Sequence, residues 1–254
     1  MGRPDKTIAP IGLWKAILLF AATSAPIYIG VYHFIPVLQN LGFTFLASYL
    51  ICFFPTFAVM FVIALLLYRQ EGNELKWTSF RNRYRLFPIT GRTWLWVLGL
   101  FVFGVAVMLS LSFTGKWLAS LSWFAPPDFF PAEINPLKVS TPGLFFGTDV
   151  SGQWGYALAY FVGWFFNIVG EELLWRGYLL PRQEASHGRW AWVVHGLLWT
   201  AWHVFWKWNL LNLLPITLAI AFVAQKTKNT TVPILVHGAV NFVPLLVLVY
   251  YILT

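Results

Sequence analysis

Charged residues are scarce in this sequence. Only 10% of its 254 residues are Asp, Glu, Lys or Arg, whereas 59% are apolar. A soluble domain normally carries about 25% charged residues. A water-facing surface with so little charge cannot cover this much apolar material, so a soluble globular protein is excluded. The composition predicts that a lipid bilayer is the solvent of the chain.

Cysteine and acidic residues are also rare. The single cysteine, Cys52, excludes an internal disulfide bond and a cysteine metal cluster. There are nine acidic residues against 17 basic ones, which gives a formal net charge of +8. The basic residues lie between apolar runs and not on one polar face. We therefore interpret them as topology signals beside anionic lipids and expect no nucleic-acid partner.

Long apolar runs occupy most of the chain, and seven are long enough to span a bilayer. They cover residues 12–33, 42–68, 93–113, 154–180, 190–208, 209–225 and 231–253. The predicted fold class is all-α, a polytopic transmembrane helix bundle of seven (six to eight) spans, because Pro244 can break the last run. The fifth and sixth runs require a tight turn between them. The first run is expected to be a membrane helix and not a cleaved signal sequence, because Pro26 follows its small residues.

We expect one integral membrane domain over residues 1–254. Residues 1–150 would form the first three helices with a basic loop and a long external loop, and residues 151–254 a polar core. Lys and Arg gather before the first helix and at 69–92, 181–189 and 226–230, which fall on one face of a seven-helix bundle. The positive-inside rule then predicts a cytoplasmic N-terminus and an external C-terminus.

Two connecting segments are long. The basic segment 69–92 carries interleaved aromatic residues and fits either an interfacial amphipathic helix or a solvated connector. The proline-rich segment 114–152 lies on the opposite face, and a loop of this length is usually a lid or disordered.

Glu171 and Glu172 are the only acidic residues inside a predicted span. A charged group near the bilayer centre costs a few kcal/mol or more, so it normally has a partner or a function. Helix rise places Glu171, His203, His237 and Asn241 roughly 14 to 21 Å from the basic residues that end their helices. Three helices therefore bring polar groups to one depth, which predicts a mid-membrane polar cavity.

Helical spacing also pairs these residues. Residues four apart share one face of a helix, as do Glu172 with Arg176, Trp199 with His203, and His237 with Asn241. The neighbouring glycines Gly170, Gly196 and Gly238 predict close helix approach.

A carboxylate and a histidine together deprotonate water and return the proton to a leaving amine. His237 and Asn241 are suited to stabilise an oxyanion. The set Glu171, His203 and His237 also matches zinc ligands, so a metal stays an alternative. Other readings are a purely structural Glu172–Arg176 pair or a proton or ion pathway.

The remaining histidines are expected to matter less. His195 shares a face with His203, two turns away, and is more often a structural residue in such a position. His33 and His187 are predicted in loops or at the interface.

Residues 171–182, EELLWRGYLLPR, closely resemble the first motif, Glu-Glu-x-x-x-Arg, of the CPBP family. That family comprises CAAX-type prenyl-protein proteases and bacteriocin-processing or self-immunity (Abi) membrane proteins. Trp199 to His203 is similar to its second motif, Phe-x-x-x-His, with Trp in place of Phe. His237 to Asn241 is similar to its third, His-x-x-x-Asn. The resemblance covers roughly residues 150 to 245.

The resemblance implies a hydrolase: an intramembrane endopeptidase acting on a membrane-associated or C-terminally tagged protein or peptide. Glu171 would activate water with His203, Glu172 and Arg176 would support it, and His237 and Asn241 would stabilise the oxyanion. The preferred mechanism requires no cofactor, although a divalent metal such as zinc is possible.

We further expect a prokaryotic inner-membrane location and a cavity open to the cytoplasm. A non-catalytic immunity or scaffold protein of the same fold is the alternative. Substrate identity and oligomeric state are open.

Overall fold

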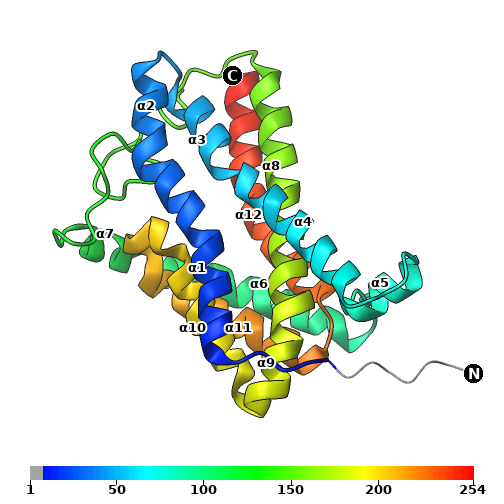
Figure 1. The fold of residues 1–254 in the computed structure, drawn as a ribbon. Helices are drawn as coiled ribbons and strands as arrows, with labels where there is room; N and C mark the ends of the chain where they lie inside the picture. Colours follow the sequence, from blue (N-terminus) through cyan, green and yellow to red (C-terminus); the bar gives the residue numbers. More distant parts are fainter. Residues whose placement is uncertain (1–7) are drawn as a thin grey trace, which may run out of the picture.

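The computed structural model describes residues 8–254, and this part of the chain is helical, with a single isolated bridge between Phe145 and Thr148 in place of any strand. Figure 1 shows the helices packed together, with the beginning of α1 and the C-terminus at opposite ends of the molecule. Most buried apolar side chains form one cluster that extends from Ala16 in α1 to Ile252 in α12, and Leu180, Ala191 and Ala224 form a small second one.

The longer helices are α1 (Leu13–Ile29), α4 (Pro55–Gln70), α6 (Arg92–Ser110), α8 (Trp154–Glu172), α10 (Ala191–Trp202), α11 (Leu210–Thr227) and α12 (Thr231–Leu253). The shorter ones are α2 (Ile35–Asn40), α3 (Phe45–Phe53), α5 (Trp77–Arg83), α7 (Ser112–Ala119) and α9 (Leu180–His187). The π-helical segments η1 (Gly30–Phe34) and η2 (Leu173–Leu179) and the 3₁₀ segments η3 (Gly188–Trp190) and η4 (His203–Asn209) connect some of them.

Five helical stretches of the described residues are long and apolar enough to span a membrane. They are Leu13–Asn40, Phe45–Gln70, Arg92–Ser110, Trp154–Thr227 and Thr231–Leu253. The protein is therefore a multi-pass membrane protein, but seven separate spans are not confirmed. Three predicted spans, 154–180, 190–208 and 209–225, lie inside one helical run of 74 residues.

That run folds back on itself at two breaks. At the first, Gly188 has a φ of 56°, which glycine adopts without strain. At the second, Trp206 in η4 has non-helical angles (φ −119°, ψ 51°), and this is the tight turn expected between the fifth and sixth runs. Between the breaks, α10 has 12 residues and is only about 18 Å long, too short to cross the apolar core by itself.

The basic segments meet at one end of the molecule, as predicted for a common face. The Ile11 amide donates to the Arg182 carbonyl, and the Thr230 amide donates to the Arg85 carbonyl. Arg85 also forms a two-pronged ion pair with Glu184 at 2.9 Å. The segments around residues 11, 85, 184 and 230 are thus in direct contact. We call this the basic end.

The segment 69–92 is docked at the basic end and is more than a solvated connector. Pro181 has no N–H to donate to the carbonyl of Gly177, four residues earlier. Arg83 donates to that carbonyl instead, at 2.8 Å. The ring of Tyr84 is fully buried against Gly177, where any Cβ would overlap it. A missing backbone donor in α9 therefore creates the anchoring point for this segment.

The segment 114–152 forms an ordered cover over the opposite end. Phe130 is fully buried and contacts the rings of Tyr32, Phe45 and Trp206. Phe146 packs edge-on against Tyr49 at 5.2 Å. At the same end, the Gly152 amide donates to the Ile252 carbonyl, so α8 begins where α12 ends. The segment is therefore an ordered cover and not a disordered loop.

Close helix approach is confirmed at two of the three predicted glycines. A Cβ at Gly170 would overlap the carbonyl oxygen of Phe57 in α4, and a Cβ at Gly196 would lie 2.8 Å from Leu218 in α11. A Cβ at Gly238 would find ordinary contacts at 3.6 Å or more. Pro244 does not split the last helix, since α12 continues through it to Leu253.

Candidate active site

Three helical elements bring the predicted polar residues to one cavity of about 240 Å³, which we call the inner cavity. Glu171 comes from the end of α8, His203 from the junction of α10 and η4, and His237 and Asn241 from α12. All four line the cavity. The convergence expected from helix depth is therefore observed.

The Glu171 carboxylate is held from two sides. Asn167, one turn earlier in α8, donates to its Oε1 at 2.8 Å, and the indole N–H of Trp199 donates to its Oε2 at 2.9 Å. The Glu171 side chain is 2% exposed. Each oxygen keeps a second lone pair, so the carboxylate can still accept a hydrogen from a molecule in the cavity.

A hydrogen-bond chain orients the amides and His237. Because the Glu171 carboxylate only accepts, Asn167 faces it with Nδ2 and presents Oδ1 to Asn241. Asn241 Nδ2 donates to that oxygen at 3.1 Å and to His237 Nε2 at 3.0 Å. His237 Nδ1–H then donates to Glu172 Oε1 at 2.8 Å. The chain fixes one tautomer of His237.

Glu172 and Arg176 lie behind the cavity. Their side chains are completely buried, with Arg176 Nε 3.1 Å from Glu172 Oε2. The angles at this contact are not those of a hydrogen bond, since Nε, Nη1 and Nη2 of Arg176 have no acceptor among the described residues. The guanidinium instead stacks on the Trp199 ring, 3.4 Å from its centroid. The pair is therefore an ion pair held by stacking, and Glu172 reaches the cavity only through His237.

His203 presents its second nitrogen to the cavity. Its Nδ1 donates to the Trp199 carbonyl at 2.8 Å, which leaves Nε2 with an unshared lone pair. That carbonyl is available because the backbone N–H of His203, its usual partner in an α-helix, donates to Thr200 and Ala201 instead. The break that ends α10 thus also sets the tautomer of His203.

Asn167 is a site residue that sequence reasoning missed. It links Glu171 to Asn241 and lines the inner cavity. Its four-residue spacing from Glu171 in an apolar helix was an available signal. The structure also pairs His195 with Gln183 at 2.6 Å, fully buried and outside the inner cavity. This agrees with a structural role for His195.

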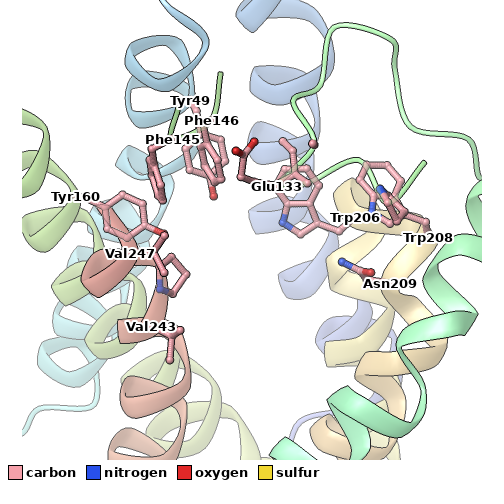
Figure 2. Close-up of a pocket in the computed structure, with 14 residues that line it drawn as sticks. Tyr49, Glu133, Phe145, Phe146, Tyr160, Trp206, Trp208, Asn209, Val243 and Val247 are labelled. Atoms are coloured by element: carbon pink, nitrogen blue, oxygen red, sulfur yellow. The ribbon is translucent and has the colours of Figure 1, made fainter. Parts of the chain in front are cut away.

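The cavity opens in the direction opposite to the one expected. We expected it to face the basic end, but it continues into a second space of about 530 Å³, the outer chamber, beneath residues 132–146 (Figure 2). The two spaces share Tyr49, Tyr160, Trp206, Asn209 and Pro244. The expectation weighed helix depth alone, whereas the space that adjoins the cavity is lined by the segment 132–146 and by Val243, Pro244 and Val247 of α12.

The possible zinc ligands do not form a metal site in this arrangement. Within residues 8–254 no group of three His, Cys, Asp or Glu is arranged to hold a metal ion. His237 Nε2, the nitrogen that a metal would need, already accepts from Asn241. We therefore derive no catalytic step through a metal.

Fold and site together define a class: a multi-pass helical membrane protein with a glutamate, two histidines and an asparagine in an interior cavity. Residues 153–243 match a family model described as Rce1-like, type II CAAX prenyl endopeptidase. The resemblance to CAAX-type proteases of the CPBP family, inferred from three motifs, is thus confirmed over this segment. No match was found among curated proteins or solved structures.

Proposed function

We propose that this protein is an intramembrane endopeptidase that hydrolyses a peptide bond of a membrane-associated or C-terminally tagged protein or peptide. The observation that carries the proposal is the lining of one inner cavity by Glu171, His203, His237 and Asn241. The match of residues 153–243 to a CAAX endopeptidase family supports it.

In the proposed reaction, a water molecule lies between Glu171 and His203. His203 Nε2 accepts one hydrogen bond from the water and orients it, while the Glu171 carboxylate removes the other proton. The water oxygen bonds to the carbonyl carbon, and the carbonyl oxygen takes the negative charge. When the intermediate collapses, the carbon–nitrogen bond breaks and the proton on Glu171 passes to the leaving nitrogen.

His237 and Asn241 are proposed to stabilise the oxyanion together. Asn241 donates to it through Nδ2, and His237, whose Nε2 carries no hydrogen in this tautomer, orients Asn241 by accepting from it. In the substrate-free arrangement both N–H groups of Asn241 are engaged, one by Asn167 and one by His237. Stabilisation therefore requires the substrate carbonyl to replace one of these hydrogen bonds. Exchange with Asn167 keeps His237 in place, because the Glu172 hydrogen bond continues to hold its other nitrogen.

Glu172, Arg176 and Trp199 are proposed as supporting residues. Glu172 orients His237, Arg176 offsets the negative charge of Glu172, and Trp199 holds both Glu171 and His203. The proposed setting is a prokaryotic inner membrane with the N-terminus in the cytoplasm, and the partners are the substrate and the bilayer. No cofactor is needed for the steps described.

The test compares membranes that express the wild type, the Glu171→Gln variant or a control variant substituted outside the candidate active site. New peptide termini are identified by mass spectrometry. We expect wild-type-specific termini to disappear with Glu171→Gln, because the glutamine amide cannot accept the proton. Asp128→Asn, an exposed acid of the covering segment, should leave them unchanged.

Retained termini in the Glu171→Gln membranes would refute the proposal. If the protein confers bacteriocin resistance that survives Glu171→Gln, the non-catalytic alternative replaces it. A parallel incubation with a chelator tests the metal: cleavage should continue, and loss that added zinc restores would show metal dependence.

A further inference from the structure

The outer chamber directly adjoins the inner cavity. Five residues line both spaces, and the chamber extends from them to the covering segment and to Val243 and Val247 in the second half of α12. A peptide whose scissile bond lies at Glu171 would reach this chamber on one side of the bond. This inference rests on the proposed function.

Aromatic rings dominate the chamber walls, and one charge lies among them. The lining rings are Tyr49, Phe145, Phe146, Tyr160, Trp206 and Trp208. Glu133, from the covering segment, is the single charged side chain among the described residues that line the chamber. Figure 2 shows it between Phe146 and Trp206.

Glu133 has no ion-pair partner among residues 8–254. The nearest basic residue along the chain, Lys138, turns to the backbone carbonyl of Asp128 instead. A carboxylate facing a space walled by aromatic rings has the chemistry that binds a cation, because ring faces also attract positive charge. The side chain is exposed, so it is accessible to an incoming ligand.

The distance to the site limits where that cation lies on the substrate. Val243 and Val247 line the chamber, and they follow His237 by six and ten residues in α12. At ~1.5 Å per residue, the chamber begins roughly 9 Å and extends roughly 15 Å from His237. An extended peptide advances about 3.3 to 3.6 Å per residue, so this span corresponds to about three to five residues.

We propose that the outer chamber binds a Lys or Arg side chain of the peptide substrate, about three to five residues from the cleaved bond. Glu133 pairs with the positive charge, and the aromatic walls cover the aliphatic part of the side chain. Glu133 is thus a specificity-determining residue for the proposed peptidase.

The experiment starts from the Glu171-dependent cleavage sites found by mass spectrometry. When these sites are aligned at the cleaved bond, Lys or Arg should recur three to five residues from that bond, always on the same side of it. A synthetic peptide with the most frequent such site is then cleaved by purified wild type, Glu133→Gln and Asp128→Asn. We expect Glu133→Gln to raise KM about two- to fivefold, as for loss of one exposed charge contact, and Asp128→Asn to have no effect.

A double-mutant cycle tests the pairing directly. Replacing the basic residue of the peptide with Gln should cost the wild type the same factor, and should cost Glu133→Gln nothing more. Glu133→Lys should prefer a peptide with Glu at that position. The proposal would be overturned if the losses from the enzyme substitution and the peptide substitution were additive. It would also be overturned if the cleavage sites had no Lys or Arg nearby and only the free amino terminus of the substrate supplied a positive charge. Absence of any Glu171-dependent site would instead refute the peptidase itself, so the two failures are distinguishable.

Discussion

Trp199 illustrates how much one residue contributes at this site. Its indole N–H donates to Glu171, its carbonyl accepts from His203, and its ring lies under the guanidinium of Arg176. The related motif has Phe at this position, and Phe provides the ring and the carbonyl but no N–H. The substitution that looked conservative in the sequence therefore adds a hydrogen bond to the proposed catalytic carboxylate.

Trp199→Phe should isolate that hydrogen bond. A hydrogen bond to a charged group contributes about 1.5–3 kcal/mol, so its loss should lower kcat about tenfold or more. KM should change little, because Trp199 does not line the inner cavity. Steady-state cleavage of a substrate peptide measures both constants. The exposed Trp190→Phe is the control, and a variant changed only in KM would contradict this role for the indole.

At the scale of the helices, the close contact of α8 with α4 positions Glu171. Gly170 lies against the backbone of Phe57, and an alanine there would overlap the Phe57 carbonyl oxygen. Gly155, in the same helix, is exposed and has nothing within 4 Å of its Cβ position. The two glycines thus form a matched pair within one element.

Gly170→Ala should destabilise the protein by about 1–3 kcal/mol, the usual cost of overpacking. It should also reduce cleavage, because moving α8 away from α4 displaces Glu171. Gly155→Ala should be neutral or slightly stabilising, since alanine favours helix over glycine. Thermal unfolding in detergent, followed by tryptophan fluorescence, provides the comparison. Equal effects of the two substitutions would show that the contact with α4 does not restrain α8.

Much of the helical arrangement was predictable because membrane helices are visible in the sequence as long apolar runs. The first, second, third and last predicted runs correspond to separate candidate spans. The middle of the chain was not predictable in the same way. Hydropathy does not predict the positive φ of Gly188 or the kink at Trp206. The helical run Trp154–Thr227 folds back on itself at these two residues.

The site was partly predictable for a physical reason as well. Glu171 and Glu172 stand out in an apolar helix because burying charge is costly. Asn167 is uncharged and passed unnoticed, although it completes the hydrogen-bond chain. The direction of the cavity depends on which end the side chains fill, and neither residue depth nor spacing contains that information.

At the scale of the whole molecule, an ion-pair network holds the basic end together. Glu71, just after α4, pairs with Arg83 at 2.6 Å and with Arg182 of α9. Burial alone would raise the pKa of Glu71, but hydrogen bonding and the positive charges of Arg83 and Arg182 outweigh it and hold the pKa below its ordinary value of 4.5. The folded protein therefore favours the ionised carboxylate.

This shift predicts an acid-sensitive contribution to stability. A group whose pKa is lower in the folded state stabilises the fold above its unfolded pKa, and the contribution disappears as the pH falls through the folded pKa. Wild type should therefore unfold at a higher temperature than Glu71→Gln at pH 7, and the difference should shrink below pH 4.5. A constant difference across that range would mean that Glu71 acts through shape and not charge. Asp128→Asn is a suitable comparison, since Asp128 is exposed and forms no ion pair among the described residues.

The two ends of the molecule also predict how it lies in the membrane. The basic end should face the cytoplasm, so the outer chamber should open on the opposite side, and substrate would arrive from there. Cys52 is the sole cysteine, so Cys52→Ala gives a background for single-cysteine labelling. In intact cells, an impermeant maleimide should label Val139→Cys, whose native side chain is 92% exposed in the covering segment. It should not label Lys226→Cys at the basic end until the membrane is opened. The reverse pattern would place the outer chamber in the cytoplasm, and the cleaved segments of the substrates should then be cytoplasmic.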